Sequence, residues 1–433
     1  MGKVKKLIKN EYVFSIFSRF VSVAISLIQS ILVARFLGSA LQGTSSYITS
    51  ITNIGAIVIT FGMHQAYPYF RKKYGKEKIF NDYMTLIIVL FTFFLLIAGV
   101  IFFLPFDNLE LKVAIFLIPI FGYSKIVAYV SLIEFPNKRN LWWTIAGITE
   151  VLFVFVLWLC VERDFLWLVA ILLFVEIFKA VVYTIMLRPK INVNKNLKPL
   201  AIDLVKYGFF PMLALLMTTL NYKIDVLMLK QYTYITSSMI GIYSIGIQMA
   251  DRIIMIPDTL KGVLVSRLAK GKDHHEVATV CRVSIWSSVF MCVIFLALGQ
   301  LVINILYGLE YKDAYYSLLI SSFGTVFIGY FKLIAQYNIV NKKQILNVIM
   351  LSVAIVTDVV FNLLLIPVWG INGAAFATGL GNFVCGLTFL IWFSAKFKIR
   401  ISEMIIPQKK DIDFIRKLFK PGSGKKEVSE DAK

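Results

Sequence analysis

The sequence predicts an all-α polytopic membrane protein with twelve transmembrane helices. Of its 433 residues, 58% are hydrophobic and only 16% are charged, and the mean hydropathy is +0.77. A soluble domain of this length needs far more polar surface. Apolar runs of about twenty residues recur from Tyr12 to about residue 395. They leave no interval long enough for a separate soluble domain.

The apolar runs divide the chain into predicted spans, and each should be helical because a segment in lipid must satisfy its own backbone hydrogen bonds. The first run is too long for a signal-peptide core, and no small-residue cleavage site follows it. We therefore expect it to be the first span. The predicted spans are 12–34, 43–70, 82–104, 111–134, 141–162, 165–187, 203–231, 238–266, 277–306, 315–340, 346–367 and 371–395.

Lysine and arginine are concentrated in alternate loops. Bases in short loops stay on the cytoplasmic side, so these loops and both termini are predicted to be cytoplasmic. The opposite loops carry single bases such as Lys112, Arg163 and Lys312. Because the net charge of +20 is spread over loops and not gathered on one face, we expect no nucleic-acid partner. The bases of the first set are Lys3, Lys5, Lys6, Lys9, Arg71, Lys72, Lys73, Lys76, Lys78, Lys138, Arg139, Arg188, Lys190, Lys195, Lys198, Lys270, Lys272, Lys342 and Lys343.

The two halves of the chain echo each other. The stretch from Arg35 to Gly43, with Tyr47 after it, resembles Tyr232 to Ile240 followed by Gly241 and Tyr243. Six spans return the chain to its starting side, so the two bundles would be parallel repeats, an arrangement typical of alternating access. The predicted parts are a basic N-terminus at 1–11, a first lobe at 12–187, a linker at 188–202, a second lobe at 203–395 and a tail at 396–433.

The tail continues the basic character of the predicted cytoplasmic side. Residues 401–419 mix isoleucines and a phenylalanine with lysines and an arginine, which predicts an interfacial helix attracted to anionic lipid. Residues 421–433 are predicted to be a disordered end.

Three stretches resemble the polysaccharide transporter family of the multidrug/oligosaccharidyl-lipid/polysaccharide (MOP) flippases. The resemblance covers essentially the whole chain, and the third stretch is the most specific. The stretches are Val33–Gly38 with Gly43, Tyr47 and Phe61-Gly62; Asp225–Leu229 with Gly241–Ser244; and Ala335-Gln336, Asn341–Lys343, Asn362–Pro367, Gly370–Ala375 and Ala377-Thr378.

This resemblance implies two six-helix lobes around a central cavity, similar to the multidrug transporters of the same superfamily. It also implies transfer of undecaprenyl-diphosphate-linked oligosaccharide from the cytoplasmic to the outer leaflet of the bacterial inner membrane, for capsule, O-antigen or related polymers. The expected partners are that lipid-linked oligosaccharide, membrane lipids and other polysaccharide-assembly membrane proteins. No cofactor and no catalytic residue are expected.

Charged residues at membrane depth are candidates for the substrate site, because a charge in the bilayer centre is costly and usually faces a bundle interior or water. A diphosphate presents anionic oxygens suited to Arg and Lys, and sugars rest on hydroxyls and amides. Helical spacing aligns Asn53 with His64 on one predicted span, Gln248 with Asp251 and Asp258 on another, and Lys332 with Gln336 on a third, and we expect these faces to line a wet cavity. The alternative is that each base pairs with a nearby acid or extends to an interface. The predicted substrate-binding residues are Arg19, Lys125, Lys223, Arg252, Lys332, Asn53, His64 and Gln248.

Four acids are candidates for coupling to a proton or sodium gradient: Glu150, Asp225, Asp251 and Asp358. A carboxyl at membrane depth can exchange a proton. A structural hydrogen bond is the alternative for Asp225, which lies in a stretch that resembles the family. Glu176 and Lys179, three residues apart, are predicted to pair. The four cysteines have no metal-ligand spacing.

Two other functions remain open at this stage. A multidrug cation antiporter would share the architecture but would line its cavity with acids and aromatic rings. A membrane glycosyltransferase or polysaccharide polymerase would need larger outer loops than those near 105–110, 163, 232, 307–314 and 368–372.

Overall fold

The computed structural model describes residues 11–105, 107–191, 197–268, 274–341, 343–409 and 411–412, with the backbone alone at 11–23, 76, 78, 262–263, 265–267 and 274. The described chain is helical and contains no strand, which confirms the all-α fold. Its elements are α2 (Glu11–Ile59), α3 (Met63–Tyr74), α4 (Lys76–Phe103), α5 (Leu109–Glu134), α6 (Pro136–Cys160), α7 (Phe165–Leu187), α8 (Lys198–Leu229), α9 (Ser237–Ala250), η1 (Asp251–Ile254), α10 (Met255–Leu268), α11 (His274–Leu306), η2 (Leu309–Tyr311), α12 (Ala314–Thr325), α13 (Ile328–Val340), α14 (Gln344–Phe397) and α15 (Ile401–Ile405).

The chain is a multi-pass membrane protein. Over the described residues, nine helices are long and apolar enough to cross a membrane, or ten if α12 and α13, bent by 45°, make one span. Two of the nine are of double length, 51 residues from Ala24 to Tyr74 and 54 residues in α14. At about 1.5 Å per residue they far exceed a hydrocarbon core about 30 Å thick. The total of twelve crossings, in which each double-length helix crosses twice, stays a prediction.

Each double-length helix is interrupted at a glycine. Gly38 in α2 has φ 73° and ψ 174°, and Gly370 in α14 has φ 55° and ψ −130°. A positive φ of this kind is strained for a residue with a Cβ, and a Cβ on Gly38 would lie 2.7 Å from Arg163 Nη1. Both breaks fall in the short intervals where the sequence predicts one span to end and the next to begin.

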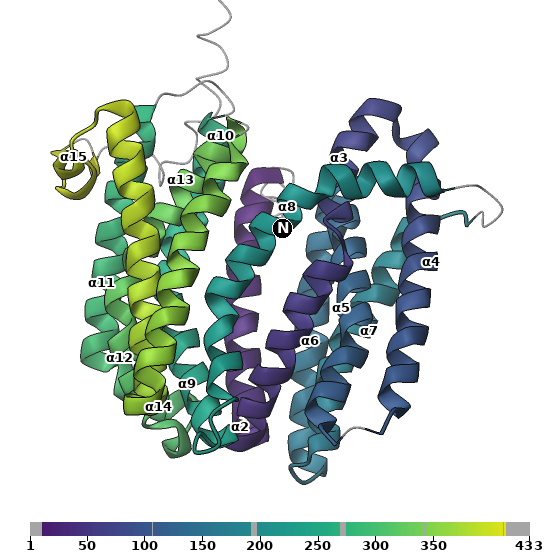
Figure 1. Ribbon diagram of the computed structural model, residues 1–433, viewed down its shortest axis with the longest axis horizontal. Coiled ribbons are helices and arrows are strands. Elements are labelled where there is room, and N and C mark those ends of the chain that lie inside the picture. The colour runs from purple at the N-terminus through teal and green to yellow at the C-terminus, as the bar shows by residue number, and fades with distance from the viewer. Residues whose placement is uncertain are drawn as a thin grey trace, which may run out of the picture.

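The helices form two upright bundles with α2, α8 and α9 between them (Figure 1). Helices α3 to α7 lie in one bundle and α10 to α14 in the other. The first turns of α8 lie across the end of the first bundle, where Leu204 packs in one cluster with Tyr67 and Tyr83. The helix, which contains Pro211, then turns to pack along α14. The predicted boundary at residue 203 therefore falls inside one helix.

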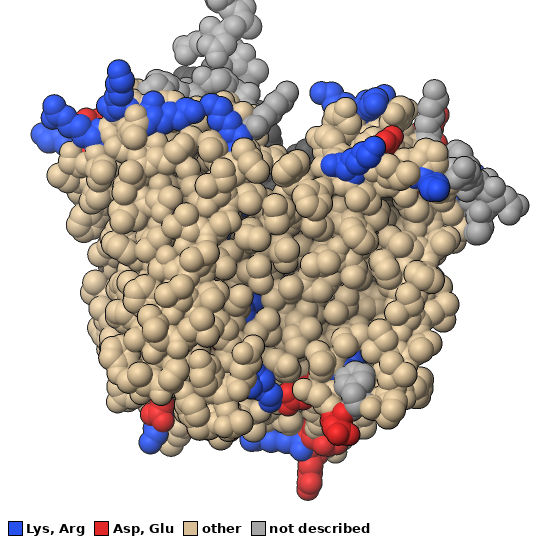
Figure 2. Space-filling view, in the orientation of Figure 1, with Lys and Arg blue, Asp and Glu red and all other residues tan. Residues whose placement is uncertain are grey.

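The two ends of the molecule differ in charge. Lys and Arg gather at the end that holds the last turn of α3 and the tip of α14, which we call the basic end (Figure 2). The opposite end, which we call the mixed end, carries acids and bases together (Figure 2). Among the described residues, the ion pairs at this end include Lys230 with Glu110 at 2.9 Å and Arg163 with Glu310 at 3.9 Å.

At the mixed end, α2 crosses α9 at very short range. A Cβ on Gly43 would lie 1.7 Å from the Ser237 carbonyl oxygen, and one on Gly241 would lie 2.0 Å from that of Ser39. The two backbones therefore touch only because both positions are glycine. We call this crossing and the Lys230–Glu110 and Arg163–Glu310 pairs the mixed-end seal.

The segment after α14 is docked on α11 at the basic end. Arg282, with 2% of its side chain exposed, donates to Asp411 at 2.6–3.1 Å and to the Glu403 carbonyl. Trp286 Nε1 donates to the Ile405 carbonyl at 2.7 Å. Of the predicted interfacial helix at 401–419, the structure shows a helix at Ile401–Ile405, and residues 413–419 lie outside the described part.

Candidate functional site

A central cavity of about 430 Å³ lies among helices α2, α8, α9, α10 and α13 and the η1 turn. Most of the residues that line it are polar. The residues that line it are Ser46, Asn53, Thr219, Tyr222, Lys223, Asp225, Val226, Tyr243, Ser244, Ile247, Gln248, Asp251, Ile254, Asp258 and Lys332. Six of the twelve predicted site residues are among them: Asn53, Lys223, Asp225, Gln248, Asp251 and Lys332.

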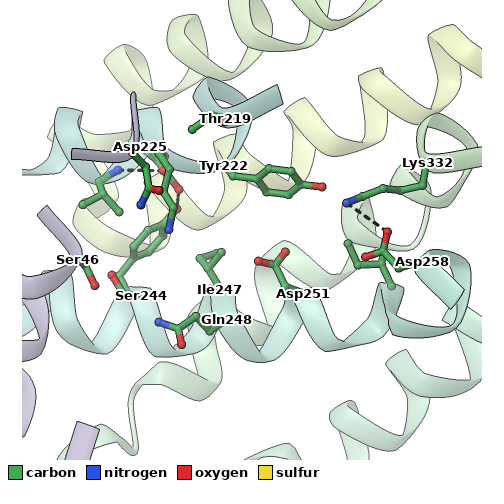
Figure 3. A pocket seen from close by; sticks show the side chains of 15 residues that line it. Ser46, Thr219, Tyr222, Asp225, Ser244, Ile247, Gln248, Asp251, Asp258 and Lys332 are labelled. Atoms are coloured by element: carbon green, nitrogen blue, oxygen red, sulfur yellow. Dashed lines mark hydrogen bonds and ion pairs between the residues drawn. The ribbon is translucent and has the colours of Figure 1, made fainter. Parts of the chain in front are cut away.

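The two bases of this cavity have different surroundings. Lys332 Nζ lies 3.5 Å from Asp258 Oδ1 and 5.1 Å from the centre of the Tyr222 ring (Figure 3). Within the described part of the chain, Lys223 has no carboxylate within ion-pair distance. The alternative of pairing with a neighbouring acid therefore applies to Lys332 and not to Lys223.

Asp225 is a hydrogen-bonded junction between three helices. Its carboxylate accepts from the Tyr243 hydroxyl, from Thr378 Oγ1 at 3.2 Å and from the Val226 N–H at 2.9 Å. These contacts join α8, α9 and α14, and only 2% of Asp225 is exposed. These contacts match the structural hydrogen bond that the sequence offered as the alternative role of Asp225. Asp225 also borders the central cavity.

Asn53 connects the cavity to a predicted base that does not line it. Lys125 Nζ on α5 donates to Asn53 Oδ1 at 2.8 Å. The amide of Asn53 faces the cavity, so the charge of Lys125 lies one residue behind the wall. The positive charge of Lys125 would therefore act on a ligand in the cavity through the polarised amide of Asn53.

A second cavity of about 290 Å³, the basic-end cavity, lies among α3, α8, α10, α13 and α14. Along α8 it contacts residues 211–218, whereas the central cavity contacts 219–226. The two cavities therefore follow one another along the helix, and Lys332 lines both. The residues that line the basic-end cavity are Gln65, Pro211, Ala214, Leu215, Thr218, Lys261, Phe331, Lys332, Ala335, Gln336, Ile339, Gln344, Asn347 and Leu351.

A third cavity, of about 220 Å³, lies among α2, α5, α6 and α7, and Glu150 lines it. Gln29, Trp143 and the predicted Glu176–Lys179 pair share its wall, and the structure confirms that pair. Glu150 has 8% of its surface exposed. This predicted coupling residue thus lines a different cavity from Asp225 and Asp251.

The remaining predicted residues lie elsewhere. The side chain of Arg19 is outside the described part. Arg252 is on the η1 turn, and His64 is buried edge-on against Tyr129 at 5.4 Å between ring centroids; neither lines any of the three cavities. Asp358 is buried on α14, where it accepts from Asn362 Nδ2 at 3.1 Å. The sequence prediction missed Tyr222 and, although helical spacing aligned it with Asp251, also Asp258.

Comparison with known proteins assigns the chain to a family. A family model described as "Polysaccharide biosynthesis protein" matches residues 9–260. The uncharacterized membrane protein MJ1068 of Methanocaldococcus jannaschii is 35% identical over 97 residues, which is 22% of this chain and 18% of that protein.

Two solved structures have the same fold. The lipid II flippase MurJ in an inward closed conformation gives a TM-score of 0.68 at 16% identity, covering 91% of this chain and 89% of that one. An inward-facing MATE family multidrug resistance transporter of the MOP superfamily gives 0.63 at 12% identity, covering 88% and 95%. The fold is thus one of transporters and flippases. Because the family model spans more than half of its length, this chain belongs to the polysaccharide biosynthesis protein family.

Proposed function

We propose that this protein moves undecaprenyl-diphosphate-linked oligosaccharides from the cytoplasmic to the outer leaflet of the bacterial inner membrane, for assembly of a capsule, O-antigen or related polymer. One observation carries the proposal: a chain of the polysaccharide biosynthesis family holds a polar cavity of about 430 Å³ at membrane depth. Amides, hydroxyls and carboxylates in that cavity match the hydroxyls of a saccharide. The fold that the chain shares with a lipid II flippase supports the same class of cargo.

The contacts at the two ends indicate which way the cavity opens. The mixed-end seal closes the side with acids and bases together, while the basic-end cavity lies on the other side of Lys332. Bases gather on the cytoplasmic side of membrane proteins. The structure then represents a state closed to the outside, and transport requires the mixed-end seal to separate while the basic end closes.

The membrane potential supplies part of the driving force. With the cell interior negative, outward movement of an anionic group gains about 2.3 kcal/mol per charge per 100 mV. Coupling to H⁺ or Na⁺ through Asp225, Asp251, Asp358 or Glu150 belongs to the same proposal. Asp225 and Asp251 border the central cavity, where cargo and ion would meet. If transport is unchanged when the proton and sodium gradients are separately collapsed, ion coupling is excluded.

Reconstitution tests the proposed function. The purified full chain is placed in vesicles whose inner leaflet carries a fluorescent undecaprenyl-diphosphate saccharide, and the label that reaches the outer leaflet is quenched by an impermeant reagent. We expect quenching to exceed that of protein-free vesicles and to fall in the Lys223→Gln and Asp251→Asn variants. Quenching equal to that of protein-free vesicles would reject the proposal.

The multidrug antiporter remains a second candidate because of the charges in the central cavity. Its lining contains three carboxylates, Asp225, Asp251 and Asp258, and two amines. Such a balance favours cations. Binding of tetraphenylphosphonium by the purified protein, without binding of undecaprenyl diphosphate, would select this function over the first.

A further inference from the structure

The two cavities that meet at Lys332 have opposite charge balance. The central cavity holds Asp225, Asp251 and Asp258 against Lys223 and Lys332. The lining of the basic-end cavity holds Lys261 and Lys332 and, among the residues that the structure describes, no carboxylate. Charges close together in a protein interior interact far more strongly than in water. An anion is therefore repelled by the acids of the first cavity and attracted into the second.

From this charge balance we propose that the diphosphate of the cargo binds in the basic-end cavity, at Lys261 and Lys332, while its saccharide occupies the central cavity. The inference rests on the proposed function and assigns the two parts of the cargo to two sites. It moves the anionic group away from Lys223, which lines the central cavity alone.

The neutral residues of the two cavities fit this division. Gln336 and Gln344 offer amide N–H donors to phosphate oxygens beside the two lysines of the basic-end cavity. In the central cavity, Asp251 accepts hydrogen bonds from sugar hydroxyls, and Asn53 and Gln248 both donate and accept. A carboxylate thus favours binding of a sugar and opposes binding of a phosphate.

The Lys332–Asp258 pair makes the diphosphate site switchable. The two groups lie 3.5 Å apart, beyond the usual length of a charge-assisted hydrogen bond, with 17% and 33% of their side chains exposed. Figure 3 shows the amine of Lys332 directed at Asp258 beside the Tyr222 ring. A diphosphate therefore competes with Asp258 for this amine, and removing the acid should strengthen anion binding.

The site also fits the path of a lipid-linked cargo. A saccharide that enters from the basic end goes first and reaches the central cavity, and the diphosphate follows into the cavity nearer that end. The polyprenyl chain then stays in the bilayer, because only the polar part of the cargo has to leave the membrane interface.

Binding measurements on the full-length protein in nanodiscs test this assignment. The probes are undecaprenyl diphosphate without sugar, undecaprenol as the uncharged control and phosphatidylglycerol as a competing anionic lipid, followed by native mass spectrometry. We expect Lys261→Gln and Lys332→Gln each to weaken undecaprenyl diphosphate binding about tenfold, and Asp258→Asn to tighten it about threefold. Lys223→Gln should change it less than about twofold.

A matched pair of variants keeps the test independent of folding defects. Gln344→Glu adds a carboxylate to the basic-end cavity at the first residue of α14, where a negative charge favours the helix. It should weaken undecaprenyl diphosphate binding about tenfold, whereas Gln248→Glu, the same change in the central cavity, should weaken it less than about twofold.

Three outcomes overturn the assignment. Equal weakening by Lys223→Gln and Lys261→Gln, with normal binding to the wild type, rejects this inference and leaves the proposed function intact. Equal binding of phosphatidylglycerol with the same variant pattern rejects it as a site for the cargo. No binding of undecaprenyl diphosphate by the wild type, together with no transport in vesicles, rejects the proposed function as well.

Discussion

Several charged residues of this protein form ion pairs, and the burial of each pair sets how much its loss would destabilise the fold. Arg282 and Asp411 form a nearly dry pair, with 2% and 10% of their side chains exposed, and join α11 to the chain after α14. Arg163 and Glu310 form a wet pair with 55% and 47% exposed. Breaking a buried pair leaves a charge without solvent or partner, whereas breaking an exposed pair returns both groups to water.

Arg282→Leu should therefore destabilise the protein by about 3–5 kcal/mol, because the buried Asp411 carboxylate loses the positive charge that compensates it. The apparent Tm of the purified protein in detergent measures the loss. Arg163→Leu is the matched control, with an expected loss of about 1 kcal/mol or less. The prediction is wrong if the two variants lose the same amount, and the double variant Arg282→Met, Asp411→Leu should recover most of the stability.

Glu310 gives the mixed-end seal a dependence on pH. Burial by itself would raise the pKa of the Glu310 carboxyl. The hydrogen bond that Glu310 accepts from the Ser39 N–H, at 2.7 Å, and the Arg163 charge outweigh burial and lower this pKa. Because the pKa of Glu310 is lower in the folded state than in the unfolded state, its ionised carboxylate stabilises the fold at pH values above the unfolded-state pKa. This stabilisation is lost as the pH falls through the folded-state pKa.

The Tm difference between the wild type and Glu310→Gln should thus be constant between about pH 7 and pH 5 and shrink at lower pH. Thermal melts across this range measure it. A difference that grows on acidification would contradict the assigned direction of the pKa shift.

At the scale of elements, the decisive contacts are helix crossings and helix breaks. The crossing of α2 and α9 depends on Gly43 and Gly241, whose absent Cβ atoms let backbones touch. The breaks decide which residues face a cavity. Helix α2 ends at Ile59, and Phe61 and Gly62 have positive φ of 46° and 67° before α3 begins.

Gly43→Ala should favour the state that is open at the mixed end, because the added methyl would lie 1.7 Å from the Ser237 carbonyl oxygen. In a cysteine-free background with Gln248→Cys, labelling from outside by an impermeant maleimide should rise several-fold. Gly99→Ala is the control, since a Cβ there meets nothing within 4 Å. Equal labelling in both variants would show that the crossing does not restrict access.

At the scale of the whole molecule, the charge asymmetry between the two ends predicts the orientation in the membrane. Lys72 and Lys73 are exposed at the basic end, and Glu110, Lys230 and Glu310 mark the mixed end. Bases are retained on the cytoplasmic side during insertion.

Cysteines at two exposed positions test this orientation. In intact cells an impermeant maleimide should label Leu309→Cys, at the mixed end, and should label Lys73→Cys only after the inner membrane is permeabilised. Leu309 is 74% exposed, so access is not limiting. The reverse pattern would place the mixed end in the cytoplasm and would invert the proposed direction of access.

By itself, the sequence determined the membrane class, the all-α fold and the family. It did so because hydropathy and turn-forming glycines such as Gly38 and Gly370 act locally along the chain. Helical spacing also located Asn53, Gln248 and Asp251 on faces that line the central cavity. For Asp225 the sequence left ion coupling and a structural hydrogen bond open. Only the fold brings Asp225 together with its partners Tyr243 and Thr378.

Only the tertiary structure decided which charges share a cavity. Asn53 and His64 fall on one predicted stripe, but the positive-φ turn at Phe61 and Gly62 restarts the helix, and His64 packs against Tyr129. Arg252 follows Gln248 by one turn, but the tighter η1 turn changes the spacing there. The Lys332–Asp258 pair joins helices separated by α11 and α12. Periodicity describes one straight helix, whereas these sites depend on where helices bend and which others they meet.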